Sequence, residues 1–422
     1  MVARPGKPPA SEVIDAVVVG AGQAGLVVSY LLAQARIHQQ VLERGRIGES
    51  WRSQRWDSFH LNTPNWSNGL AGMGFPSELP DGFSHRDRLT EYFEDYAKSF
   101  NLPIRQHTNV VSLDRSPSGG YVLRTETDTI HATVVVLAAG SMSRPRLPAM
   151  AQRLAGDLTA LSSGTYRNPQ ALPDGAVVVV GSGQSGCQIA EDLLNAGRKV
   201  YICASRVGRI PRVYRGREIF DWWRDMKYFE VKVDELEDPS IQYAAQPQVS
   251  GTDGGHTVSL QSLANDGATL LGRVQNVDGH ILELGSNLQE CIEFADEKSR
   301  AFKTAIDGYI ERNGIDADPP LPDPGEPALP DLNGSGNVET LDLRKAGVAS
   351  VIWCTGFDAD WSWVNLDIFD DRGRPRHRAG ITESPGLYVI GFPWLSKRKS
   401  GILYGVSEDA AHIVQRIENY LG

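Results

Sequence analysis

The sequence predicts an α/β fold with two dinucleotide-binding units, and three observations carry this prediction. Residues 15–44 hold, in order, an apolar run, a G-x-G-x-x-G triplet, a helical stretch and a short strand that ends in an acid. Nearly the same order returns over residues 176–206. Apolar runs that end in small residues recur at 133–140 and 348–356, as in strands buried on both faces of a parallel sheet.

In the first unit each glycine has a separate role. Gly20 permits a tight turn, Gly22 lets the backbone approach a pyrophosphate, and Gly25 lets the helix pack close to the strand. The helix over 26–34 would face the phosphates with its N-terminus. Glu43 ends the second strand, where a carboxylate can accept hydrogen bonds from ribose hydroxyls. A plain glycine turn between helix and strand is the alternative, and the acid and both strands disfavour it.

The second unit repeats the spacing with Gly181, Gly183 and Gly186, but its second strand has no terminal acid. Ser205 and Arg206 stand there instead. An arginine at this position accommodates a 2′-phosphate, which favours NADP over NAD. A solvated surface arginine is the alternative.

Composition excludes several classes of protein. The chain has 422 residues, a net charge of -10 and 41% hydrophobic residues, which indicates a globular protein of about two domains without nucleic-acid or anionic-membrane partners. No apolar run is long enough for a membrane span or a signal peptide. The four cysteines form no C-x-x-C pair, so we expect neither a dithiol centre nor a metal site. We expect a reducing, cytoplasmic location.

Between and after the two units the pattern is mixed. A long irregular segment rich in Gly, Pro, Asn and Trp follows the first unit, and its length favours a functional role. Residues 208–231 are rich in arginine and aromatic residues. They either line a cleft between domains or recognise phosphate, or they form a packed aromatic cluster with a solvated basic rim. The remaining predictions are strands at 105–113, 121–125, 133–137 and 387–391, helices at 88–100, 296–313 and 408–421, a short helix and hairpin over 257–284, and a proline-rich linker at 319–330.

Taken together, the motifs resemble the class B flavin-dependent monooxygenases, a family that includes flavin-containing monooxygenases, Baeyer–Villiger enzymes and plant indolepyruvate monooxygenases. In that family the first glycine motif binds FAD and the second binds NADPH. Further family segments appear as Gly48 to Trp51, Asn62-Thr63, Thr108 to Val110, Ala138 to Gly140, Cys354 to Gly356 and Leu387 to Gly391. The cofactor-binding residues implied are Gly20, Gly22, Ala24, Gly25, Glu43, Arg44, Trp51, Asn62, Thr63, Val110, Ala139, Gly140, Gly181, Gly183, Gln184, Ser185, Gly186, Ser205 and Arg206.

Two departures from the family pattern stand out. Ser162 occupies the place of the histidine in the identifying motif, although Tyr166 keeps its aromatic residue. The last strand is followed by Gly391-Phe392-Pro393 instead of Gly-Asp, so contacts to the flavin ribityl chain must come from elsewhere.

The resemblance implies two Rossmann-like domains, with an NADPH domain at 173–349 inserted into an FAD domain made of 1–172 and 350–422. It implies a monooxygenase that uses FAD, NADPH and O2 on a small organic substrate through a C4a-(hydro)peroxyflavin, and a homodimer is compatible with it. Asn62 is the candidate catalytic residue, and a turn-capping Asn before Thr63 is the equal alternative. An NADPH oxidase or acceptor reductase without oxygen insertion, which the missing histidine favours, and a redox-sensing flavoprotein remain as rival functions.

Overall fold

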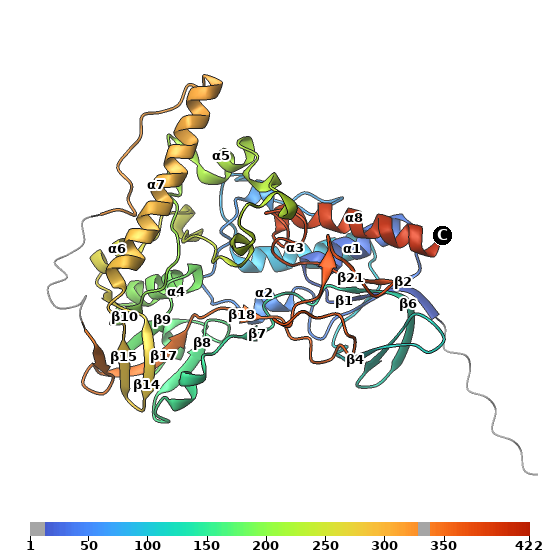
Figure 1. Ribbon diagram of the computed structural model, residues 1–422, viewed down its shortest axis with the longest axis horizontal. Helices are drawn as coiled ribbons and strands as arrows, with labels where there is room; N and C mark the ends of the chain where they lie inside the picture. The colour runs from blue at the N-terminus through green and yellow to red at the C-terminus, as the bar shows by residue number, and fades with distance from the viewer. Residues whose placement is uncertain (1–12, 328–337) are drawn as a thin grey trace, which may run out of the picture.

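The computed structural model describes residues 13–327 and 338–422. Two sheets built on parallel strands lie toward opposite ends of the molecule, each flanked by helices (Figure 1). The strands at the centre of each sheet are valine-rich and buried, as the apolar runs predict. The α/β class predicted from the sequence is confirmed.

The first sheet has the order β19-β20-β21-β6-β1-β2-β3, with β5 pairing β6 and β4 pairing β5. Strands β21, β6, β1, β2 and β3 run parallel, so their carboxyl ends meet at one edge. The bounds are β1 Val13–Val19, β2 Gln39–Leu42, β3 Ile104–Arg105, β4 Val110–Arg115, β5 Tyr121–Thr125, β6 Thr129–Leu137, β19 His377–Arg378, β20 Ile381–Thr382 and β21 Leu387–Val389.

The second sheet is entirely parallel, in the order β13-β10-β9-β17-β8. Its strands are β8 Thr159–Ser162, β9 Ala176–Val180, β10 Val200–Cys203, β13 Thr269–Leu271 and β17 Val348–Trp353. A three-stranded antiparallel sheet lies beside it, made of β14 Val274–Asp278, β15 Ile281–Leu284 and β16 Thr340–Asp342, and it contains the predicted hairpin.

The two sheets are joined by paired connections. Strand β7, Arg144–Pro145, runs antiparallel to β18, Phe357–Asp358, so the outgoing and returning chains lie side by side. The boundaries predicted from the sequence, after residue 172 and before residue 350, leave β8 with the first unit, whereas β8 pairs with β17 in the second sheet. The division into domains remains a prediction.

Eight α-helices are described in these two ranges, and α8 packs along α1 beside the first sheet (Figure 1). They are α1 Gln23–Gln34, α2 Glu49–Ser53, α3 Arg86–Ser99, α4 Gln184–Asn195, α5 Ile219–Asp225, α6 Leu260–Asn265, α7 Leu288–Asn313 and α8 Leu403–Leu421. The short pair β11 Val213–Tyr214 and β12 Arg217–Glu218 precedes α5. Single turns of 3-10 helix lie at Asn65–Ser67, Ala149–Arg153, Pro169–Ala171, Tyr228–Glu230, Val233–Glu235, Pro239–Tyr243 and Thr252–Gly254.

Two helices begin earlier than the sequence predicts. Helix α7 starts at Leu288 instead of residue 296, because Leu288, Cys291 and Ile292 extend its buried apolar face by two turns. Helix α8 starts at Leu403, five residues before the acid taken as its first turn. The predicted proline linker is described only to residue 327, and there Asp323 packs against the rest of the chain through ion pairs with Arg209 and Lys303.

Candidate functional site

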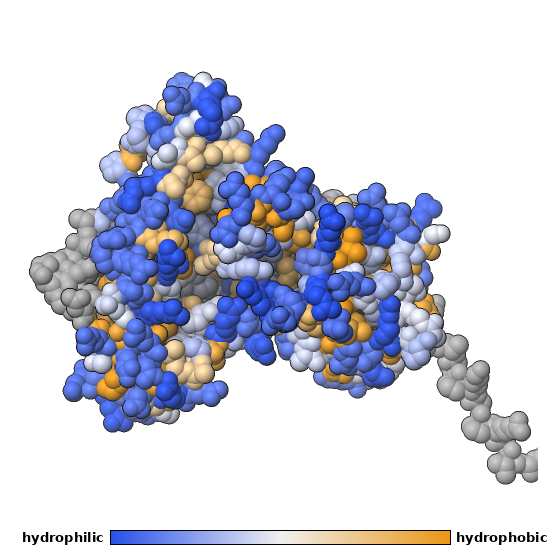
Figure 2. Space-filling model, in the orientation of Figure 1, coloured by the Kyte–Doolittle hydropathy of each residue, from blue (hydrophilic) through white to orange (hydrophobic). Residues whose placement is uncertain are grey.

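A cavity of about 790 Å³ opens at the carboxyl edge of the first sheet. Open α/β sheets bind ligands at this edge, outside the ends of their parallel strands. The turns after β1, β2, β6 and β21 form one side, and α4 with the segment 220–249 forms another. The surface is hollowed between the two halves of the molecule, with hydrophobic side chains around the hollow (Figure 2).

Most residues predicted to bind cofactor gather in this cavity. Those that line it are Gly20, Gly22, Ala24, Glu43, Arg44, Trp51, Asn62, Thr63, Val110, Ala139, Gly140, Gln184 and Ser185. Gly25, Gly181, Gly183, Gly186, Ser205 and Arg206 do not line it. The first motif thus borders the cavity directly, whereas the second contributes mainly the first turn of its helix.

The glycines of the first motif have the geometry that the sequence predicts. Gly20 has a φ of +109°, and a Cβ there would lie 2.4 Å from the carbonyl oxygen of Ala138. A Cβ on Gly25 would lie 1.8 Å from the carbonyl oxygen of Gly20, so helix and turn can meet only at glycine. A Cβ on Gly22 would meet nothing within 4 Å, and Gly22 faces the cavity.

Both motif helices begin without a side-chain cap. Gly22 and Gly183 occupy the N-cap positions of α1 and α4, and neither helix has an acid in its first turn. In contrast, α5 is capped by Glu218 and α6 by Ser259. The first N–H groups of α1 and α4 are therefore free of side-chain acceptors, an arrangement that suits a bound anion.

Glu43 holds the turns of the first unit together. Its carboxylate accepts from the backbone N–H of Ala21 at 2.7 Å and of Gly45 at 2.8 Å, and the residue is 7% exposed. Each carboxylate oxygen has a further lone pair available to a ribose hydroxyl. Glu43 directly follows β2, as the sequence predicts, and its bond to Gly45 also fixes the loop that follows, which the sequence does not indicate.

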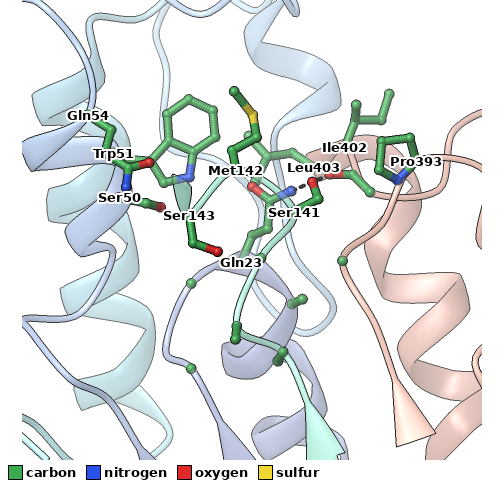
Figure 3. Close-up of a pocket in the computed structure, with 18 of the residues that line it drawn as sticks. Gln23, Ser50, Trp51, Gln54, Ser141, Met142, Ser143, Pro393, Ile402 and Leu403 are labelled. Atoms are coloured by element: carbon green, nitrogen blue, oxygen red, sulfur yellow. Dashed lines mark hydrogen bonds between the residues drawn. The ribbon is translucent and has the colours of Figure 1, made fainter. Parts of the chain in front are cut away.

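One wall of the cavity comes from the irregular segment after β2. Trp51 of α2 stands on one side, and Pro393, Ile402 and Leu403 stand on the other, with Ser141 and Met142 between them (Figure 3). The long irregular segment thus lines the cavity, as its length suggested.

The Arg55 guanidinium lies 5.1 Å from the centroid of the Trp51 ring. Burial lowers the pKa of Arg55 to about 10, which leaves it charged at neutral pH.

The side chain of Asn62 connects the two units through hydrogen bonds. Its Nδ2 donates to Oε1 of Gln184 at 3.1 Å, and its Oδ1 accepts from Nε2 of Gln188 at 3.0 Å. Both glutamines belong to α4, the helix of the second motif. Gln188 is not among the residues predicted from the sequence. It lies one helical turn after Gln184, so the helical periodicity is the signal that could have identified it.

Ser205 and Arg206 lie at the carboxyl end of β10, as predicted. The backbone N–H of Ser205 donates to Oγ of Ser182 at 2.8 Å. The Arg206 side chain is 65% exposed, lies over the ring of Phe294 at 4.2 Å, and is 3.8 Å from a carboxylate oxygen of Glu290. It is therefore a solvent-facing guanidinium held near the strand end.

The arginine- and aromatic-rich segment combines the two roles that the sequence left open. Phe220 and Trp223 line the cavity and also belong to a packed aromatic cluster. Arg209 is fully buried and pairs with Asp296 and Asp323, both at 2.7 Å. The structural role of Arg209 cannot be predicted from its neighbours in the sequence.

Arg212 is buried as well, and its guanidinium lies 3.7 Å from the centroid of the Phe83 ring. It pairs with Glu218 at 3.1 Å and donates to the carbonyl oxygen of Asn62 at 2.9 Å. Burial raises the pKa of Glu218 to about 7 and lowers that of Arg212 to about 10. Arg212 thus fixes the backbone that presents Asn62 to the cavity.

Both departures from the family pattern have a clear location. Ser162 ends β8, where its Oγ lies 3.2 Å from Oγ1 of Thr165, and it does not line the cavity. Gly391 and Pro393 do line it, beside the first residues of α8. The N-terminus of α8 faces the cavity, which the sequence could not establish.

Comparisons with known proteins agree with this arrangement. The family described as pyridine nucleotide-disulphide oxidoreductase matches residues 17–214. An uncharacterized CzcO-like oxidoreductase of Geobacillus kaustophilus is 29% identical, with 97% of this chain and 99% of that protein covered. A probable indole-3-pyruvate monooxygenase of Arabidopsis thaliana, YUCCA3, is 27% identical over 96% of this chain and 86% of its own.

The solved structures show the same fold. A flavin-containing monooxygenase from Stenotrophomonas maltophilia has a TM-score of 0.65 at 17% identity, covering 97% of this chain and 100% of that one. OTEMO in complex with FAD and NADP has a TM-score of 0.54 at 15% identity, covering 97% and 86%. These structures confirm the predicted fold, and together with the sequence relatives they confirm the resemblance to flavin-dependent oxidoreductases. No helix within residues 13–327 and 338–422 is long and apolar enough to cross a membrane.

Proposed function

We propose that this chain, a flavin-dependent oxidoreductase related to the flavin monooxygenases, binds FAD in its first unit and NADPH in its second and inserts one oxygen of O2 into a small organic substrate. The observation that carries the proposal is the shared cavity. The first glycine motif borders it, and Asn62 on its wall is hydrogen-bonded to the helix of the second motif. Hydride transfer requires that the two cofactors meet at one point.

The residues present fit an FAD at the first unit. The uncapped N-terminus of α1 and the open space at Gly22 can accept a pyrophosphate, and Glu43 can accept from a ribose. Arg44 and Val110 line the same cavity. FAD held by these residues would supply the hydride-accepting and oxygen-reactive chemistry of the proposed reaction.

The chain's own groups would control that chemistry. Asn62 offers an amide that can donate and accept at once, close to where the two cofactors would meet. The N-terminus of α8, beginning at Leu403, favours negative charge in the cavity. The aromatic wall around Trp223 limits access of water, which protects reactive species from hydrolysis.

The alternative function, an NADPH oxidase or acceptor reductase, is the one that the missing histidine favours. Ser162 lies away from the cavity lining, so its identity does not change the walls around the reacting groups. The two functions differ in stoichiometry. A coupled monooxygenase yields oxygenated product in proportion to NADPH consumed, whereas an oxidase yields hydrogen peroxide.

The experiment therefore measures three quantities in one reaction of the purified holoenzyme: NADPH consumed, hydrogen peroxide released and oxygenated product formed from a panel of thioethers, amines and ketones. Product formation that rises while peroxide falls supports the proposal. Peroxide equal to NADPH with every compound in the panel supports the oxidase instead.

A further inference from the structure

We infer that the substrate of this site is an apolar molecule that carries one carboxylate, and that Arg398 and Trp223 bind that group. The inference rests on the proposed function only in taking the cavity as the substrate site. Both residues line the cavity. Both also contact the same ring: Arg398 lies 4.1 Å from the centroid of Tyr228, and Trp223 stacks on it at 4.9 Å.

Each of the two side chains has a buried donor without an acceptor among the described residues. These are Nε of Arg398 and Nε1 of Trp223. Buried N–H groups are normally hydrogen-bonded, and leaving one unpaired is costly. The two side chains that carry these donors contact one tyrosine ring and line one cavity, and we take the unpaired donors to indicate a missing acceptor.

The charges around Arg398 strengthen this reading. Lys397 and Lys399, its neighbours on either side, both pair with Glu230 and Glu408. The described residues give Arg398 no carboxylate partner, and its Nη1 donates a hydrogen bond to the hydroxyl of Tyr228 at 2.9 Å. The acids nearby are thus used by the lysines, and the arginine beside the cavity keeps its charge available.

The surroundings define the rest of the ligand. Phe220 and Phe229 line the same wall and pack with each other at 5.3 Å. An apolar body would rest against these rings, while its carboxylate accepts from the guanidinium and the indole. Arginine matches a carboxylate better than lysine does, because its planar fork can form two parallel bonds.

A second arginine of the cavity provides a matched control. Arg55 also has no carboxylate partner among the described residues, but it lies over Trp51 on the other side. If the cavity binds anions only through its general charge, removing either arginine should have the same effect. The inference predicts that only Arg398 matters for the carboxylate.

The test measures binding to the oxidised holoenzyme by isothermal titration calorimetry, so it needs no turnover and stands apart from the oxygenation assay. The probes are (phenylthio)acetate and its uncharged amide. Wild type should bind the acid about tenfold to a hundredfold more tightly than the amide, the range for a hydrogen bond to a charged group. Arg398→Gln should abolish this preference, Arg398→Lys should keep part of it, and Arg55→Gln should retain it.

Two further measurements separate the carboxylate from the cofactors. Trp223→Phe keeps an aromatic ring, although a smaller one, and removes the indole N–H donor, so it should weaken acid binding by roughly twofold to tenfold more than it weakens binding of the amide. Arg398→Gln should leave the dissociation constant of NADP+ unchanged. Equal affinity for acid and amide in wild type, failure of both to bind, a preference that survives Arg398→Gln, or a parallel loss of NADP+ binding would each overturn the inference.

Discussion

Asn62 donates its side-chain amide to Gln184 at 3.1 Å, across 122 residues of sequence. The bond joins the irregular segment of the first unit to the first turn of the second motif's helix. The turn after Asn62 is closed by other groups, since Thr63 Oγ1 donates to Asn68 Oδ1 at 2.6 Å. The turn-capping alternative therefore describes Thr63 better than Asn62, whose side chain is directed to the cavity.

We predict that Asn62→Asp uncouples the reaction. The change keeps the size but removes the donor to Gln184 and adds a negative charge beside the proposed flavin site. Loss of one preorganised donor at a developing charge costs ~2.7–4 kcal/mol, so the ratio of oxygenated product to NADPH should fall strongly while hydride transfer survives. Stopped-flow flavin bleaching follows hydride transfer, and product and peroxide assays follow coupling. Asn313→Asp, at the end of α7, is the control; unchanged coupling in Asn62→Asp would show that Asn62 has only a structural role.

A second prediction concerns Gly22. Gly22→Leu should fold, because a Cβ there meets no atom within 4 Å, yet it should not retain FAD because the side chain fills the space for the pyrophosphate. Flavin content after purification and far-UV circular dichroism measure the two effects. In Gly25→Ala the added Cβ would lie 1.8 Å from a carbonyl oxygen, so that variant should lose stability as well. A folded Gly22→Leu protein with a full complement of FAD contradicts the assignment.

The local patterns were predictable from the sequence, and the contacts between distant segments were not. The turn at Gly20 and the acid at Glu43 follow from steric and hydrogen-bonding needs within about 30 residues, so the motif contains them. The contacts of Asn62 with α4 depend on how the two units pack, which no local pattern encodes. The same holds for Arg209, whose sequence surroundings suggest a surface cation, although its partners 87 and 114 residues away bury it.

A third prediction concerns the pH dependence of stability. His256 Nε2 lies 2.6 Å from a carboxylate oxygen of Glu191 on α4, and this hydrogen bond raises the pKa of His256. Because the folded pKa exceeds the unfolded value of about 6.5, the stabilisation is fully present below that pH and is lost as pH rises through the folded pKa. The pair is partly exposed, so we expect roughly 1 kcal/mol.

Glu191→Gln should therefore lower the free energy of unfolding near pH 5.5 and have a smaller effect near pH 8.5, as measured by urea denaturation. Glu94→Gln is the matched control, because Glu94 pairs with Arg52 at 2.7 Å and an arginine does not titrate in this range. Equal losses at both pH values in Glu191→Gln would mean that the pair does not depend on the protonation of His256.

The last prediction assigns the choice between NADPH and NADH to Arg206. Its guanidinium is 65% exposed at the end of β10, and its contacts among the described residues are the Phe294 ring and, at 3.8 Å, Glu290, so it can meet a 2′-phosphate. Arg209 and Arg212 are buried in ion pairs and cannot take its place. A bond between charged groups contributes ~1.5–3 kcal/mol, so Arg206→Ala should raise the Michaelis constant for NADPH by roughly tenfold or more and leave that for NADH nearly unchanged. Arg312→Ala, at the far end of α7, should change neither constant. Only NADPH carries the 2′-phosphate. An equal rise of the Michaelis constants for both cofactors would therefore show that Arg206 supports the strand end and does not bind the phosphate.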